Sequence, residues 1–163
     1  MQAIRLTDAV KVVTGCAPAA LTSTAGDGDY VSLKNYSKLT IVLSVLNATT
    51  VTGGTITLKQ ATAVAGTSEK ALAFDKMWAN TDTDASDTLT ETAVTSNTFT
   101  TDTTNSKKLL YVMEVDAADL DVANGFDCVR IDSTGMASAV GSVMYYLSGA
   151  RNRSPIAKAA ITD

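Results

Sequence analysis

The chain has 163 residues, enough for one domain to bury a hydrophobic core without metals or disulfides. Its net charge of −4 lacks the basic surplus of nucleic-acid-binding proteins. No apolar run reaches the roughly 18 residues that a membrane-spanning helix needs. Residues 1–13 also lack the continuous apolar core of a secretion signal. We therefore expect one domain that binds neither nucleic acid nor membrane.

The composition is rich in threonine and poor in charged residues. The chain contains 25 threonines, whereas charged residues make up only 18% of it. Threonine is β-branched and suits a pleated, half-exposed surface. The composition therefore favours strands over exposed helices.

The N-terminal part gives the weakest signals. Residues 4–13 are ambiguous between a strand and a helical turn, although their valines favour a strand. Residues 15–29 are small, polar and rich in glycine, which predicts a loop. We expect residues 1–29 to form an irregular segment within a single domain of residues 1–150.

Strong strand signals follow. A short strand is expected at residues 30–33. The aliphatic run at 39–46 indicates a strand covered on both faces or held centrally in a sandwich. Residues 55–60 alternate apolar and polar side chains, which is typical of a half-buried strand. A Gly-Gly pair lies between these last two runs, so we expect them to form a hairpin.

The middle of the chain is more polar. Two short strand segments are expected around Asp75 and Lys76. Residues 80–106 are the least hydrophobic stretch, and a long flexible loop is one interpretation of them. Threonines at alternate positions favour two short edge strands instead, near residues 88–94 and 98–101.

The C-terminal third contains three further strand signals. Residues 109–115 and 126–131 predict strands, and Asp116 is placed to cap a short helical turn between them. A turn is expected at residues 132–135, after which residues 139–147 would complete a hairpin. In that last strand, one face would carry Val143, Tyr145 and Leu147.

Together these signals predict an all-β fold. Eight to ten short strands without helical periodicity favour an antiparallel β-sandwich, with a jelly roll as one form of it, and with extended terminal arms. Residues 151–163 lack strand alternation, and Pro155 opposes strand pairing. We expect this segment to be an extended C-terminal arm, either a solvated tail or an arm that reaches a neighbouring subunit.

The residues offer little catalytic chemistry. The chain has no histidine, which removes the commonest general base and the commonest zinc ligand. Nucleophile-elbow, P-loop and dinucleotide-binding motifs are also missing from the sequence. We therefore expect a protein that is not an enzyme and needs no cofactor.

Two residue sets have a second interpretation. Asp82, Asp84 and Asp87 could hold calcium, but they lack the spacing of an EF-hand loop, so a solvated acidic loop is favoured. Cys16 and Cys128 are expected to be thiols in a reducing cytosol, with a disulfide left open.

Three stretches carry a resemblance to a known class of proteins. They are residues 30–43 (YVSLKNYSKLTIVL), 56–74 (ITLKQATAVAGTSEKALAF) and 126–152 (FDCVRIDSTGMASAVGSVMYYLSGARN). In their sequence character and their order along the chain they resemble small structural proteins of tailed bacteriophages, although they contain no signature motif. The resemblance implies a β-sandwich made in the host cytoplasm that assembles on the virion. Decoration proteins of this kind sit on the capsid surface as dimers or trimers.

The leading hypothesis is a protein that decorates or cements the capsid by binding across major capsid protein subunits. The residues expected to contact this partner lie towards the two ends of the chain: Arg5, Leu6, Arg151, Arg153, Pro155 and Ile156. A tail or head–tail joining protein is the alternative, with residues 80–106 as its stacking loop. The least favoured hypothesis is a carbohydrate-binding β-sandwich that stacks sugars on Trp78, Tyr145 and Tyr146.

Overall fold

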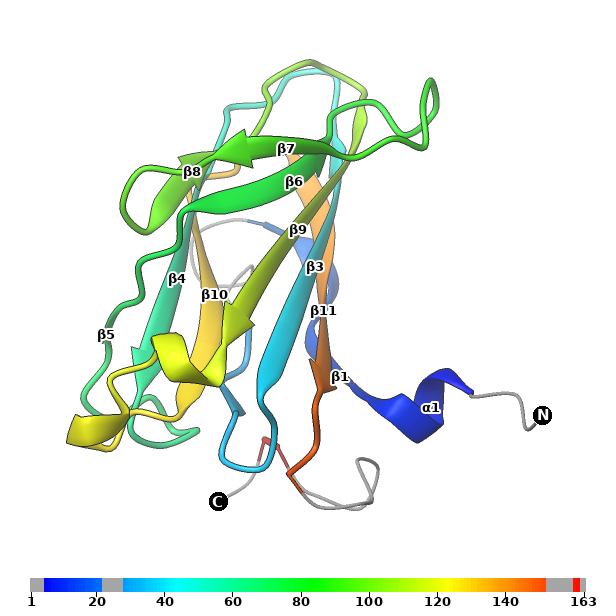
Figure 1. The fold of residues 1–163 in the computed structure, drawn as a ribbon. Helices are drawn as coiled ribbons and strands as arrows, with labels where there is room; N and C mark the ends of the chain where they lie inside the picture. Colours follow the sequence, from blue (N-terminus) through cyan, green and yellow to red (C-terminus); the bar gives the residue numbers. More distant parts are fainter. Residues whose placement is uncertain (1–4, 22–27, 152–159, 162–163) are drawn as a thin grey trace.

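A computed structural model describes residues 5–21, 28–151 and 160–161 of the chain (Figure 1). Two antiparallel sheets pack face to face, which confirms the all-β sandwich. The first sheet has six strands, in the order β1 (Val10–Ala20), β11 (Ala139–Ser148), β3 (Lys38–Asn47), β9 (Lys108–Asp116), β6 (Lys76–Asn80) and β7 (Thr90–Ala93). The second sheet has five, in the order β2 (Val31–Ser32), β10 (Cys128–Thr134), β4 (Thr55–Ala61) and β5 (Lys70–Ala71), with β8 (Thr98–Thr100) also paired to β4.

The connectivity is that of a jelly roll. Strands β1 to β4 alternate between the sheets, and the order β1-β11-β3-β9 faces the order β2-β10-β4-β5. These are the two nested Greek keys that define a jelly roll. The β6–β7 hairpin lengthens the first sheet beyond this eight-strand frame.

Both hairpins expected from the sequence are wrong. The runs 39–46 and 55–60 do form β3 and β4, but β3 pairs with β9 and β11 while β4 pairs with β10. Likewise β10 and β11 belong to opposite sheets. Each connection crosses from one sheet to the other, because in a jelly roll consecutive strands cover opposite sides of the same core.

The N-terminal segment is more regular than its composition predicts. Residues 15–20 were expected in a loop, but they belong to β1, which pairs with β11 along the edge of the sheet. Two register shifts, on either side of Cys16, absorb the small residues. Pro18 is tolerated because an edge strand can spare a backbone donor. Gly15 lies so close to Tyr145 that a Cβ atom there would be 2.6 Å from its ring.

Other expected elements are confirmed with small changes. The two edge strands expected in the polar region 80–106 are β7 and β8. Asp116 precedes the 3₁₀ turn η1 (Ala117–Asp119), and its backbone N–H donates to Asp119 Oδ2 at 3.0 Å. A second 3₁₀ turn, η2, spans Val122–Asn124. The turn expected to start at residue 132 begins later, because β10 continues through Thr134.

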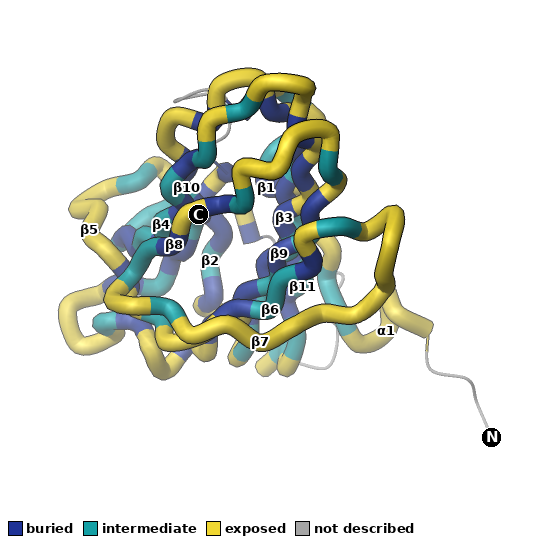
Figure 2. The backbone as a smooth tube through the Cα atoms, turned by 90° about the horizontal axis from the view of Figure 1, so that it is seen from above, coloured by how far each residue is buried: buried dark blue, intermediate teal, exposed yellow. Residues whose placement is uncertain are grey.

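The core lies between the sheets, where the buried positions gather in Figure 2. Val143, Tyr145 and Leu147 share the inward face of β11, as their spacing predicts. Short helical elements lie outside the sheets, and α1 (Leu6–Ala9) is one of them. In the described part of the chain, none of the helices has the length and apolar character that crossing a membrane requires.

Candidate functional site

The outward side of the six-stranded sheet carries a row of apolar side chains. Trp78 lies opposite Val112, Val112 opposite Val42, and Val42 opposite Met144, so the row crosses four neighbouring strands. Residues opposite each other in a sheet share a face. These four alternate with buried core residues along their strands and therefore point away from the core.

A second apolar pair extends this row towards one end of the sheet. Leu46 of β3 lies opposite Val140 of β11, and their side chains are 47% and 48% exposed. A shallow groove of about 450 Å³ lies over this pair, with Pro18 and Leu110 among its walls. From here on, the outer face means the six apolar residues Val42, Leu46, Trp78, Val112, Val140 and Met144.

Charged side chains border the outer face at both ends. At one end Lys38 Nζ lies 2.8 Å from Glu114 Oε2, and this contact raises the pKa of Lys38. At the other end Lys108 Nζ lies 2.9 Å from Asp84 Oδ1, and this contact raises the pKa of Lys108. Each end therefore carries a cation beside an anion.

Two of the three aspartates in the calcium hypothesis, Asp82 and Asp84, form ion pairs with lysines. Lys107 pairs with Asp82, and the hydrogen bond between them lowers the pKa of Asp82. Asp82 and Asp84 therefore already have cationic partners from the start of β9 and the residue before it. Within the described ranges, no group of three or more acidic or cysteine side chains is arranged to hold a metal ion.

The outward side of the five-stranded sheet is built differently. Glu69 Oε1 lies 2.7 Å from Lys59 Nζ, and Glu69 Oε2 lies 3.1 Å from Arg130 Nη2. Lys59 also lies 2.6 Å from Asp132. The Tyr30 hydroxyl donates to Glu69 at 2.6 Å, and burial followed by this bond raises the pKa of Tyr30. This side is therefore covered by charges that pair with one another.

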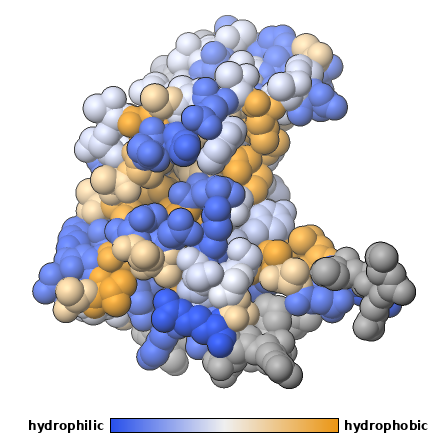
Figure 3. Space-filling view, in the orientation of Figure 1, coloured by the Kyte–Doolittle hydropathy of each residue, from blue (hydrophilic) through white to orange (hydrophobic). Residues whose placement is uncertain are grey.

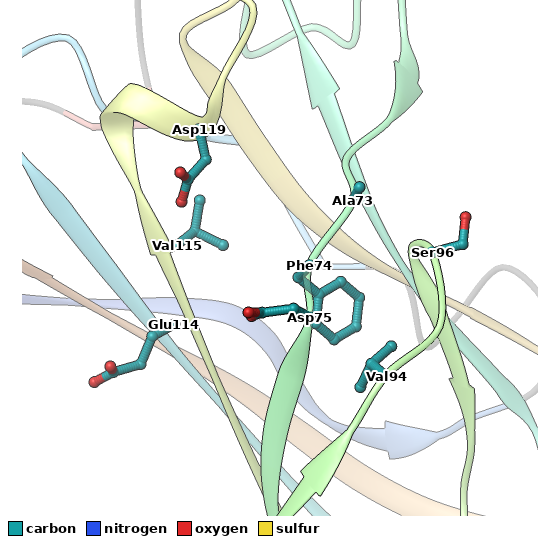
Figure 4. A pocket seen from close by; sticks show the side chains of 8 residues that line it. All are labelled: Ala73, Phe74, Asp75, Val94, Ser96, Glu114, Val115 and Asp119. Carbon is teal, nitrogen blue, oxygen red and sulfur yellow. The ribbon is translucent and has the colours of Figure 1, made fainter.

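A cleft of about 560 Å³ lies between the β5–β6 connection and the end of β9 (Figure 4). Phe74 and Val94 supply apolar walls. Of its carboxylates, Glu114 points away from these walls and pairs with Lys38, while Asp119 accepts the backbone N–H of Asp116. These two carboxylates therefore have bonding partners within the chain.

The N-terminal candidates lie on a projection. Arg5 precedes α1, and its backbone N–H donates to Asp8 Oδ2 at 3.2 Å. The helix buries none of its residues, and Leu6 is 60% exposed. Figure 1 shows α1 extending away from the sandwich, and Figure 3 shows hydrophobic residues on the same side of the molecule. We call residues 5–9 the N-terminal arm.

The C-terminal candidates are only partly within the described residues. Arg151 is exposed, and its backbone N–H donates to the carbonyl of Asn35 at 3.0 Å. Arg153, Pro155 and Ile156 lie outside the described ranges. Beyond them, buried Ala160 accepts a hydrogen bond from the Ser32 N–H at 2.6 Å. This part of the expected arm therefore packs on the chain's own domain.

The sheet register places the start of β1 beside the end of β11. Val10, the first residue of β1, lies opposite Ser148, the last residue of β11. The N-terminal arm and the segment that begins near Arg151 therefore leave the same end of the six-stranded sheet. The sugar-stacking hypothesis is wrong about Tyr145, which is fully buried on the inward face, whereas Trp78 and Tyr146 lie on the outward side of the sheet.

The outer face was not predicted from the sequence. Its signal was present in the nearly continuous β-branched and aliphatic run of β3, which places Val42 and Leu46 on the side opposite to the core residues. Spacing alone could not show that Val112 and Met144 continue the same row, because their strands are remote in the sequence.

Comparisons with known proteins add one structural likeness. Neither a protein-family model nor a curated protein matches the chain. The SPBc2 prophage-derived protein YomS, a solved structure, is similar at 13% sequence identity and a TM-score of 0.43. The likeness covers 85% of this chain and 93% of YomS.

Proposed function

We propose that this protein is a non-enzymatic structural component of a bacteriophage virion that decorates or cements the capsid across major capsid protein subunits. It would be made in the host cytoplasm and act on the capsid surface. The observation that carries this proposal is the N-terminal arm, which projects from the sandwich and buries none of its own residues. The phage virion is proposed because of a sequence resemblance to small phage structural proteins, which residues 30–43, 56–74 and 126–152 carry.

A projecting arm suits a protein that joins subunits. The described residues leave the Leu6 side chain 60% exposed, so contact with another molecule would bury apolar surface there. Binding energy of this kind adds to the shell only in its assembled state, which stabilises that state. Repeated over a lattice, weak contacts of one arm become strong attachment through multivalency.

The surface of the sandwich also supports a binding role over a catalytic one. Threonine-rich surfaces lose less side-chain entropy on contact than surfaces of lysine and glutamate. Many of the carboxylates are held in ion pairs, for example Asp82 with Lys107 and Glu69 with Lys59. The chain has no histidine to act as a general base.

The test is to locate and count the protein in purified phage particles. Quantitative mass spectrometry should find hundreds of copies per particle, and electron microscopy should show matching density on the outer capsid surface. Deleting residues 1–9 should strongly reduce the copy number without unfolding the domain, because α1 buries nothing. Density confined to the tail would favour the tail or head–tail alternative, and absence from the particle would refute the virion assignment.

A further inference from the structure

We infer that the outer face binds the outer face of a second copy of this chain, forming a two-fold symmetric dimer. This inference concerns self-association of the purified protein and does not depend on the proposed capsid role. Three observations carry it: the apolar character of the face, its size, and the pattern of charge around it.

The apolar character is unusual for a solvent-facing sheet. An antiparallel sheet with one wet side normally places polar side chains there. The five-stranded sheet does so, with Lys59, Glu69 and Arg130 paired across its outward side. The six-stranded sheet instead places Trp78, Val112, Val42 and Met144 side by side. Aromatic residues and methionine are enriched in protein interfaces.

The strand β3 shows why a partner is needed. Its inward side chains, such as Ile41 and Leu43, are fully covered by the core. Its outward side chains are Lys38, Thr40, Val42, Ser44 and Leu46, and the two apolar ones among them are at least partly exposed. Apolar side chains at two outward positions of a central strand favour a cover on that side of the sheet. Within the described residues nothing covers Leu46, which is 47% exposed.

The size of the sheet fits a stable pair. Strands β3 and β11 each have 10 residues, β9 has 9, and β1 has 11. With strands ~4.8 Å apart and a rise of ~3.3 Å per residue, these four strands and β6 present about 700 Å². An interface of standard size buries about 800 Å² on each partner. Two copies meeting face to face would therefore bury close to the area that a specific dimer needs.

The charges around the outer face favour a second copy of this chain over a partner whose surface charges all have the same sign. Each end of the sheet carries a cation beside an anion, Lys38 with Glu114 at one and Lys108 with Asp84 at the other. Whichever ends meet across a two-fold axis, each lysine can approach a carboxylate of the other copy. A uniformly acidic or basic partner would leave half of these charges repelled. An isologous contact of this kind closes at two copies.

The experiment uses the full chain and a double variant, Leu46→Glu with Val140→Glu. These two residues are adjacent, exposed and outside the core, so the variant should fold. Sedimentation velocity over a concentration series should show a wild-type dimer. The variant should raise the dimer dissociation constant by about 100-fold or more, because each copy would bury two carboxylates in an otherwise apolar contact.

The control is Val122→Glu, which makes the same type of substitution at a residue that is 59% exposed on η2, outside the six-stranded sheet. It should leave the dimer intact, and circular dichroism should show that all three proteins are folded. The inference is overturned by a wild type that stays monomeric or forms a trimer. It is equally overturned if the double variant still dimerises, or if the control dissociates the dimer as strongly. Loss of capsid binding in the double variant, with a monomeric wild type, would mean that the face binds the shell instead of a second copy.

Discussion

The backbone N–H of Ile131, in the five-stranded sheet, donates a hydrogen bond of 3.2 Å to the hydroxyl oxygen of Tyr145, in the six-stranded sheet. Tyr145 is fully buried. Its ring also fills the space beside Gly15 of β1. One side chain therefore connects the edge strand β1 with both layers of the sandwich.

Tyr145→Phe tests this connection. Losing the hydroxyl leaves the Ile131 N–H buried without that acceptor, which should lower the free energy of unfolding by about 1–3 kcal/mol. Urea unfolding followed by circular dichroism measures the change. Tyr146→Phe is the matched control, since Tyr146 is the neighbour on the outward side and only half-buried, and it should change stability by less than about 0.5 kcal/mol. Equal effects in both variants would contradict a special role for the bond.

Buried tyrosines should also make the protein sensitive to alkali. Burial is the main cause that raises the pKa values of Tyr30 and Tyr145 above the ordinary tyrosine value. In the unfolded chain tyrosine loses its proton near pH 10. Above that pH the folded state still holds protons that the unfolded state has released, so stability is complete below pH ~10 and falls as the pH rises further.

The expected result is a free energy of unfolding that is flat near neutral pH and declines from pH ~10 upward. Tyr145→Phe removes one of the titrating groups, so it should reduce that decline by up to about 1.4 kcal/mol per pH unit. Denaturant unfolding at several alkaline pH values measures both slopes. A variant whose slope equals that of the wild type would show that Tyr145 does not contribute.

The main strands could be predicted from the sequence, but their partners could not. Runs such as residues 39–46 and 109–115 are β-branched and aliphatic, so they mark strands wherever they pair. Alternation shows which side chains share a face of one strand, and it does not show which strand lies beside it. Val42 has Val112 and Met144 as its neighbours, each some seventy or more residues away along the chain. The outer face depends on these remote pairings and was missed for that reason.

Strand β1 was missed for a different physical reason. Residues such as Gly15 and Pro18 have low intrinsic strand preference, so composition predicts a loop. In the structure the pairing with β11 and the close packing on Tyr145 override that preference. Tertiary contacts decide the outcome where local preference is weak.

The charge network on the five-stranded sheet should contribute measurably to stability. Glu69 accepts the Tyr30 hydroxyl and lies between Lys59 and Arg130. Glu69→Ala should lower the free energy of unfolding by about 1–3 kcal/mol, because it removes the acceptor of a buried hydroxyl and a shared anion. The control Asp84→Ala breaks an exposed pair with Lys108 and should cost less than about 1 kcal/mol. Urea unfolding compares the two, and a larger loss in the control would refute this order.

The last prediction separates the N-terminal arm from the outer face. Leu6→Ser changes a side chain that is 60% exposed and touches no core, so the free energy of unfolding should change by less than about 0.5 kcal/mol. If the arm docks on the capsid, the variant loses the apolar burial of one leucine there, worth about 1.5–3 kcal/mol, and binds each shell site about 10- to 100-fold more weakly. Co-sedimentation of the protein with purified shells measures that affinity, with Val122→Ser as the control for an exposed apolar residue elsewhere. An unchanged affinity for the shell would show that the N-terminal arm does not contribute to shell binding. It would not bear on the dimer expected through Leu46 and Val140, which sedimentation velocity tests separately.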